Sequence, residues 1–374
     1  MKYLFILGRN VKLSSAEVLA YLVRKEISVN DYSLRDNALL IDMEETLDAD
    51  AINSLGGVIS IGLVISSGSS GETKEVISGL EKQSIYDGSK NNLTYFIWDF
   101  SEDSQEVRDY LKSRFKSEKL RASEKVFTRS VKSQEGENLF NVGSKLVDEQ
   151  YFIFEISGKD TYFGRIVQKC DYDELEKRDM LKPVRREDLA ISPRLSKIMI
   201  NLSHIKPGGK LLDGFCGIGV VLEEGLLQDL KVIGIDKDKS AIEGAKQNFI
   251  WFKSKVADYE LINADSTRIR LPKADVLVTE PDLGETLKKT PTREKAKQQL
   301  REYENLMIDV LNNVRKSVNG RAVFTAPHIR IMNKRLGCNA ERIANETGFK
   351  MVKGFPINEH RSNQIVGRQI FVME

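Results

Sequence analysis

Short apolar runs separated by amphipathic stretches organise the second half of the chain. Four of these runs end in an acidic residue, at Asp213, Asp236, Asp265 and Glu280. Such runs predict buried strands, and the stretch 241–252 between the second and third runs predicts a helix. Because strands that alternate with helices form parallel sheets, the four acidic residues are expected on one carboxyl edge, where open α/β sheets bind ligands.

A glycine-rich turn follows the first of these strands. Gly214, Gly217 and Gly219 come after Asp213 and predict a tight turn that leads into a helix. Glycines let the backbone approach a ligand closely, although such turns also occur as plain connections. Asp236 lies 23 positions after Asp213 (236 − 213), about where nucleotide-binding units place the carboxylate that binds ribose hydroxyls. The two features together predict a site for an adenosine-type ligand.

The first half of the chain is predicted to hold two smaller α+β domains. Residues 1–66 show the order strand, helix, strand, strand, helix, strand, which is typical of a ferredoxin-like domain. The Ser/Gly-rich stretch 66–71 predicts a flexible linker. Residues 72–169 show a strand, a helix, a strand and a hairpin, residues 170–190 form a charged linker, and residues 191–374 hold the apolar runs described above.

Composition places the chain among ordinary globular proteins. Its 374 residues are 41% hydrophobic and 30% charged, enough for two or three domains with proper cores. No apolar run approaches the roughly 20 residues that span a bilayer, and the apolar stretch 1–7 lacks a small-residue cleavage site. A cytoplasmic protein without a membrane anchor is expected. The three cysteines and three histidines are scattered, which argues against disulfides and against a metal site.

Basic residues concentrate between Arg108 and Lys132, where nine of them stand against three acidic residues. Such a stretch can bind nucleic-acid phosphates, or it can solvate an exposed face. The linker 170–190 is also rich in arginine and either contacts RNA or spans the surface. The candidate RNA-binding residues from both stretches are Lys112, Arg114, Lys116, Arg121, Arg129, Arg178 and Arg185.

The sequences of these motifs resemble those of a known enzyme family, the THUMP-domain tRNA guanine-2-amino methyltransferases. These are Rossmann-like enzymes that use S-adenosylmethionine. The likeness covers nearly the whole chain, closely in the second half and loosely in the first. The stretches that carry it are Asp213–Gly219, Ile235–Asn248, Asn263–Asp265 and Glu280–Gly284, with Arg178–Arg185 and Ser192–Met199 upstream.

The resemblance implies a seven-stranded α/β sheet with an antiparallel last strand, preceded by the ferredoxin-like region and a THUMP-type domain that binds tRNA. It implies S-adenosylmethionine as the cofactor and the 2-amino group of a guanosine as the acceptor. It leaves open which nucleotide is modified, whether one or two methyl groups are added, and whether a small activating protein subunit is needed. The cofactor-binding residues carried over are Asp213, Phe215, Gly217, Gly219, Asp236 and Asp265.

The catalytic motif departs from the family pattern at three positions. The family carries Asp or Asn, two prolines and an aromatic residue, whereas this chain reads Glu280, Pro281, Asp282 and Leu283. The resemblance makes Glu280 the hydrogen-bond acceptor for the amine and Pro281 the donor of a second acceptor, its backbone oxygen. Glutamate reaches about one methylene further than aspartate, and a misplacement on the order of 1 Å can cost about 100-fold in rate. Leu283 cannot stack on a base as an aromatic residue would.

These departures keep two further functions open. One is a tRNA-binding protein that keeps the cofactor but does not catalyse methyl transfer. The other is a methyltransferase acting on an adenine amine in nucleic acid.

Several single residues could have a structural role in place of a functional one. Phe215 and Cys216 either touch the ligand or pack beneath the turn, and His328 either faces the pocket or packs after its strand. Glu223 and Glu224 are expected on an exposed helix face, with the alternative that a carboxylate in this early turn of the helix contacts the methionine amine of the cofactor.

Overall fold

A computed structural model describes residues 1–69, 73–126, 130–132, 138–140, 147–186, 191–285, 287, 289–361 and 363–374. The chain forms two compact units. The first comprises Met1–Val11, Ile27–Asn53 and Gly57–Cys170, and the second comprises Lys12–Glu26, Ser54–Gly56 and Asp171–Glu374. No helix among the described residues combines the length and the apolar character needed to cross a bilayer.

The first unit is built on one eight-stranded sheet with the order β2-β3-β1-β4-β10-β9-β5-β6. Both predicted N-terminal segments therefore supply strands to the same sheet, while their assignment to ferredoxin-like and THUMP-type domains stays a prediction. The elements are β1 Lys2–Leu7, β2 Val29–Arg35, β3 Ala38–Met43, η1 Ala51–Ser54, β4 Val58–Gly68, α2 Thr73–Glu81, β5 Asn92–Phe100, α3 Gln105–Ser117, β6 Arg121–Glu124, β9 Glu149–Glu155 and β10 Thr161–Lys169, with β7 Ser130–Lys132 and β8 Asn138–Phe140 as a separate pair.

Alternation along β5 explains why this sheet is covered on both faces. Tyr95 and Ile97 belong to a core cluster shared with α2 and α3, whereas Phe96 and Trp98 belong to a second cluster shared with β1 and β3. Successive side chains of a strand point to opposite faces, so a strand that is apolar throughout must be buried on both sides. The predicted linker begins inside β4, since this strand continues through Gly68.

The second unit has the predicted Rossmann-like sheet. Its order is β13-β12-β11-β14-β15-β18-β17, with β16 Lys334–Leu336 paired to β15. Neighbouring strands from β13 to β15 are parallel, and β18 runs antiparallel to β15 as predicted. The strand bounds are β11 Lys210–Asp213, β12 Lys231–Asp236, β13 Tyr259–Asn263, β14 Val276–Thr279, β15 Ala322–Ile331, β17 Ile357–Glu359 and β18 Val366–Met373.

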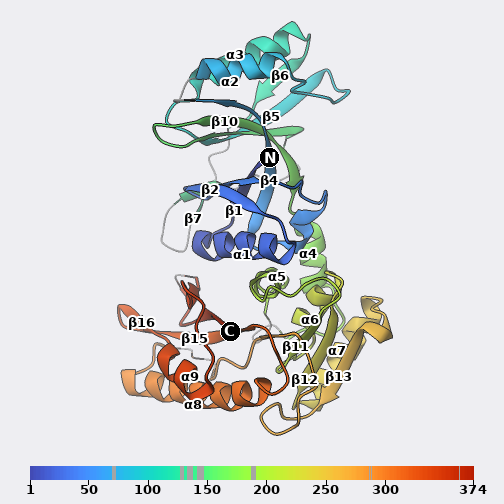
Figure 1. The fold of residues 1–374 in the computed structure, drawn as a ribbon, viewed down its shortest axis with the longest axis vertical. Coiled ribbons are helices and arrows are strands. Elements are labelled where there is room, and N and C mark those ends of the chain that lie inside the picture. Colours follow the sequence, from blue (N-terminus) through green and yellow to red (C-terminus); the bar gives the residue numbers. More distant parts are fainter. Residues whose placement is uncertain are drawn as a thin grey trace. The chain divides into compact units, whose positions relative to one another are not determined.

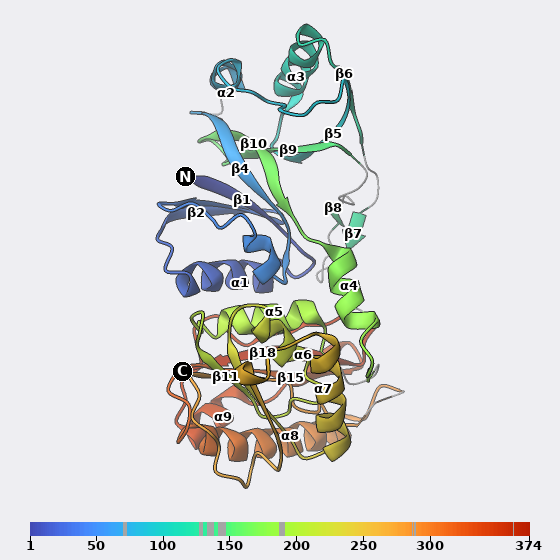
Figure 2. The same cartoon turned by 90° about the vertical axis from the view of Figure 1, so that its right-hand side faces the viewer.

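Helices cover both faces of this sheet. Leu211 packs with one group of helices (α1, α5, α6 and α7) and its neighbour Leu212 packs with the other (α8 and α9). Figures 1 and 2 show α5 and α6 on one side of the strands and α8 and α9 on the other. The helix bounds are α1 Val11–Arg24, α4 Tyr172–Met180, α5 Pro193–Leu202, α6 Val220–Leu226, α7 Lys239–Trp251, η2 Val256–Asp258, α8 Arg293–Val314 and α9 Ala340–Thr347.

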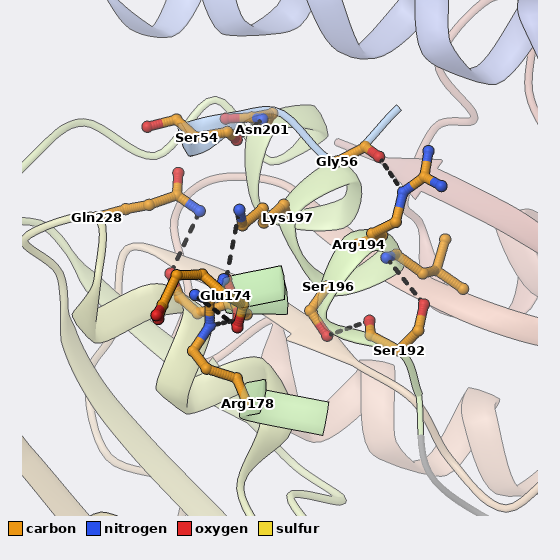
Figure 3. A network of polar contacts seen from close by, with 12 residues as sticks. Ser54, Gly56, Glu174, Arg178, Ser192, Arg194, Ser196, Lys197, Asn201 and Gln228 are labelled. Carbon is orange, nitrogen blue, oxygen red and sulfur yellow. Dashed lines mark hydrogen bonds and ion pairs between the residues drawn. The ribbon is translucent and has the colours of Figure 1, made fainter. Parts of the chain in front are cut away.

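Two short segments from the N-terminal part of the chain are built into this second unit. Asn201 of α5 donates to the backbone oxygen of Ser54 at 2.8 Å, and Arg194 Nε donates to the backbone oxygen of Gly56 at 2.7 Å (Figure 3). Arg24 at the end of α1 is buried, and its guanidinium donates to Asn201 Oδ1 at 2.9 Å. Burial lowers the pKa of Arg24 to about 10. These polar contacts fix α1 and residues 54–56 against α5.

The predicted linker contains a helix that is tied to a buried acid. Within 170–190 the structure forms α4, and Arg178 Nε of this helix donates to Glu224 Oε1 at 2.9 Å. Glu223 and Glu224 are both buried, so their predicted place on an exposed face is wrong. The reason is that the cations of α4 and α5 approach α6 on this side, with Lys197 Nζ 3.9 Å from Glu224 Oε2. The pKa of Glu223 is raised to about 8, mainly by burial.

Candidate active site

Three of the four acidic residues predicted for the sheet edge lie at the carboxyl ends of neighbouring parallel strands. Asp213 ends β11, Asp236 ends β12, and Glu280 follows β14 directly. All three line a cavity of ≈ 530 Å³ in the second unit, together with the glycine-rich turn and the stretch that follows β14. Asp265 is two residues past the end of β13 and is not among the lining residues. Its carboxylate accepts hydrogen bonds from the backbone and hydroxyl of Thr267.

Asp213 is the most buried acid of this edge. Its Oδ1 accepts a hydrogen bond from Thr279 Oγ1 at 2.5 Å and one from the backbone N–H of Phe215 at 3.0 Å. Burial raises its pKa to about 7, and the nearby Asp236 and Glu280 act in the same direction, while the two hydrogen bonds oppose the shift. A carboxyl group that titrates near neutrality therefore lies at the base of the cavity.

The glycine-rich turn is held by Asp236. Its Oδ2 accepts from the backbone N–H of Gly217 at 2.9 Å, and its Oδ1 accepts from the backbone N–H of Asp238 at 2.8 Å. Gly219 has φ 92°, a conformation that favours glycine, and an added Cβ would lie 2.8 Å from Phe249 Cε1. Around Gly217 (φ 52°) an added Cβ would meet nothing within 4 Å, so this part of the turn faces open space.

Glu280 is held from two sides and keeps one oxygen without a partner. Its Oε1 accepts from Thr325 Oγ1 of β15 at 3.2 Å and from Arg368 Nε of β18 at 2.5 Å. The carboxylate is 8% exposed, and among the described residues its buried Oε2 has no hydrogen-bond partner. A carboxylate oxygen is an acceptor only, so this atom is suited to receive an N–H or O–H group in the cavity.

The other motif positions also line the cavity. Pro281 is buried, Asp282 is exposed, and Leu283 is half-buried with its backbone oxygen accepting from Gln299 Nε2 at 3.1 Å. Sequence reasoning missed Arg368, which lies 88 positions after Glu280 in a strand without any motif. Only the antiparallel placement of β18 beside β15 brings it to the cavity, so no local signal could have indicated it.

Arg186 is a second arginine of the cavity lining that sequence reasoning did not assign to the site. Its Nη2 lies 2.6 Å from Asp238 Oδ2, and both residues line the cavity. This guanidinium and Ser240 hold the pKa of Asp238 well below its usual range. The contact joins the end of the charged stretch after α4 to the loop that follows β12.

The predicted RNA-binding residues fall into distinct environments. Lys112, Lys116 and Arg121 are exposed in the first unit, while Arg114 of α3 pairs at 2.5 Å with Glu118, the residue that follows this helix. In the second unit Arg185 is exposed, and Arg178 makes the contact with Glu224 described above. Arg129 lies outside the described residues.

Two other candidate chemistries find no support in the described part of the chain. His328 is 8% exposed, packs with its ring centroid 5.7 Å from that of His360, and is not among the residues lining the cavity. Burial lowers the pKa of His328 to about 4. No cluster of three or more His, Cys, Asp or Glu suited to a metal ion occurs among the described residues. Cys216 lines the cavity, and burial raises the pKa of its thiol.

Comparisons with known proteins find a likeness over the part of the chain that holds this site. Residues 183–351 match the model of the RMKL-like methyltransferase domain. This segment, which is less than half of the chain, is similar to that family of methyltransferase domains. The methyltransferase domain holds the strands that carry Asp213, Asp236 and Glu280, so the cavity described above lies in the matched region apart from the residues of β18 and the turn before it.

Named relatives extend the likeness to the whole chain. The tRNA (guanine(10)-N2)-dimethyltransferase of Pyrococcus abyssi is 24% identical over 100% of this chain and 99% of its own length. The enzyme of the same name from Methanothermobacter thermautotrophicus is 36% identical over 115 residues, which cover 30% of this chain and only 33% of that relative. The crystal structure of TrmN from Thermus thermophilus aligns over 100% of this chain and 99% of its own, with TM-score 0.55 and 12% identity, and supports the fold.

Proposed function

We propose that the chain is an S-adenosylmethionine-dependent tRNA methyltransferase that acts on the exocyclic 2-amino group of a guanosine. The observation that carries the proposal is Glu280, a buried carboxylate at the carboxyl edge of a methyltransferase sheet with one oxygen free to accept an N–H group. The likeness to tRNA (guanine(10)-N2)-dimethyltransferases, over the full length in one case, supports the same substrate class.

The residues at the glycine-rich turn fit an adenosyl cofactor. The open space over Gly217 leaves room for a ligand against the backbone, and Phe215, Gly217 and Asp236 line the same cavity. In this proposal Asp236 binds the ribose hydroxyls, and Asp213 and Gly219 shape the turn that receives the methionine part. Asp265, which bonds to Thr267, acts at the edge of this site. S-adenosylmethionine supplies an electrophilic methyl group on a sulfonium.

Glu280 and Pro281 would orient the amine of the base. The lone pair of an exocyclic amine is delocalised into the ring, so the nitrogen must be turned toward the methyl group and the base plane must be fixed. Glu280 Oε2 and the backbone oxygen of Pro281 accept the two N–H groups. The new N–C bond forms as the C–S bond breaks, the sulfur keeps the bonding electrons, and the surplus amine proton passes to Glu280 or to solvent.

The exposed cations of the first unit would bind the tRNA backbone. Lys112, Lys116 and Arg121 belong to a basic stretch, and contacts of this kind position a nucleic acid without reading its sequence. Arg114, Arg129, Arg178 and Arg185 belong to the same proposal. We place this activity in the cytoplasm, where tRNA is modified, and we include a small activating subunit as a partner to be tested.

Methyl transfer into tRNA tests the proposal directly. Purified protein is incubated with tRNA and S-adenosylmethionine labelled in the methyl group, and the nucleosides are identified by mass spectrometry. N2-methylguanosine or its dimethyl form is expected. E280A should lower the rate by about 100-fold, because the acceptor that orients the amine is lost. The matched control is E294A, which removes an exposed carboxylate at the start of α8 and should leave the rate unchanged.

Two other outcomes identify the competing functions. The exposed Asp282 and the half-buried Leu283 stand where the family carries proline and an aromatic ring, which favours a tRNA-binding protein that keeps its cofactor without catalysis as the second candidate. Calorimetric binding of S-adenosylhomocysteine without label in any tRNA would select that candidate. Label recovered only in methyladenosine would select an adenine-amine enzyme, and an E280A protein as active as the wild type would remove Glu280 from its role.

A further inference from the structure

The last strand of the sheet reaches the catalytic motif through a single side chain. Arg368 lies on β18 opposite Pro327 of β15, and its Nε donates to Glu280 Oε1. The guanidinium is 24% exposed and lines the cavity, while Glu280 is 8% exposed. The two charges therefore meet in a poorly solvated place, where a hydrogen-bonded ion pair fixes geometry far better than it does at a surface.

The two carboxylate oxygens of Glu280 differ in their hydrogen-bond partners. Oε1 receives both protein donors, from Thr325 and Arg368, whereas Oε2 receives none among the described residues. A glutamate has one more rotatable bond than the aspartate of the family motif and loses more rotamer freedom when it is fixed. Two donors on one oxygen remove that freedom and leave the other oxygen presented to the cavity.

We propose that Arg368 is a positioning residue that aims the free oxygen of Glu280 at the acceptor amine. The inference rests on the proposed function, and it explains how a motif with glutamate in place of aspartate can work. Arg368 itself acts through Glu280. Thr325 supports the same oxygen from β15, and the backbone oxygen of Thr325 in turn accepts from the hydroxyl of Tyr303 of α8.

Removal of the guanidinium should leave the Glu280 side chain free to turn. With only Thr325 donating to Oε1, the carboxylate can adopt other rotamers, and its acceptor oxygen is no longer held toward the cavity. The loss should therefore fall on kcat, because the amine is misplaced, while the affinity for the cofactor stays unchanged.

The test compares R368Q, R368K and the wild type in the tRNA methylation assay at saturating cofactor. R368Q should lower kcat by about 100-fold near pH 7, because a displacement of about 1 Å in a catalytic group costs that much. R368K keeps a cation that can donate to Oε1 but not the planar fork, so it should recover part of the loss and reach a kcat within about tenfold of the wild type.

Two controls separate positioning from folding and from failure of the proposed function. R342Q removes an arginine paired with Glu304 on α9, away from the cavity, and should leave kcat unchanged. Calorimetric affinity for S-adenosylhomocysteine should be equal in R368Q and the wild type, because Arg368 is not placed in the cofactor turn.

Each result has a fixed meaning. R368Q with wild-type kcat, or a kcat in R368K as low as that of R368Q, overturns the positioning role while the proposed function stands. A wild-type protein that methylates no tRNA overturns the proposed function itself. In that case the pair is tested by binding alone: guanosine affinity equal in R368Q and wild type would also overturn the inference.

Discussion

Substitution of Asp213 by asparagine should change how the stability of the methyltransferase domain depends on pH. The carboxyl group is fully buried, and burial raises its pKa in the folded protein to about 7 from its ordinary value of 3.8. Between these two values the folded state holds a proton that the unfolded state has lost. The stability contributed by the protonated group is therefore complete below about pH 4 and is lost progressively as the pH rises to about 7.

The magnitude follows from the size of the shift. A difference of about 3 pKa units corresponds to about 4 kcal/mol, at about 1.4 kcal/mol per unit. D213N cannot ionise, and its side-chain oxygen can still accept from Thr279 and from the backbone of Phe215. The free energy of unfolding of D213N minus that of the wild type should therefore increase by about 4 kcal/mol between about pH 4 and about pH 8.

Tryptophan fluorescence can report on the relevant unit alone. The chain has two tryptophans, Trp98 in the first unit and Trp251 at the end of α7 in the second. In a W98F background, urea titrations followed through Trp251 measure the methyltransferase unit at each pH. D275N, which alters an exposed carboxylate that accepts from the backbone of Lys210, is the matched control and should follow the wild type.

The difference between variant and wild type removes the contribution of all other titrating groups. Glu223, whose pKa is also raised, is present in both proteins and cancels. A stability difference between D213N and the wild type that stays constant from pH 4 to pH 8, to within about 1 kcal/mol, would refute the reasoning, because it would mean that Asp213 is ionised throughout this range.

Two further substitutions test the packing around the site. R178A leaves the fully buried Glu224 without its guanidinium and should destabilise the second unit by about 3 kcal/mol, measured by urea denaturation. G219A forces a Cβ against Phe249 at a φ of 92° and should cost about 2 kcal/mol in the same assay and weaken binding of S-adenosylhomocysteine. G217A, where an added Cβ meets nothing, should cost less than G219A.

The corresponding controls and contrary results are simple to state. K177A removes a neighbouring lysine of α4 whose pair with Glu174 is exposed, and it should leave stability unchanged. Equal stability of R178A and K177A would show that the ion pair between Arg178 and Glu224 does not contribute to the free energy of unfolding. A larger loss in G217A than in G219A would show that backbone freedom, and not contact with Phe249, makes glycine necessary in this turn.

Periodicity and turn chemistry predicted the sheet of the methyltransferase unit because each strand and its acidic end are local in sequence. Asp213, Asp236 and Glu280 could be placed together since parallel strands share a carboxyl edge. Arg368 could not, because it reaches Glu280 through strand order and not through spacing. Burial of Glu224 was missed for the same reason, as its cations come from α4 and α5 and not from its own helix.

The polar contacts around α5 make the folding of α1 depend on residues that lie much later in the chain. Glu17 and Arg24 are synthesised early, and their partners Asn201 and Gln228 are synthesised some two hundred residues later. Until α5 and the residues after it emerge, the buried Arg24 lacks its acceptors on Asn201, Ile205 and Gln228, so the methyltransferase unit cannot reach its final packing. Cutting the chain at residue 170 would separate α1 from α5. The C-terminal fragment would then expose the surface of α5 that α1 covers in the folded protein, and an exposed surface of this kind promotes aggregation.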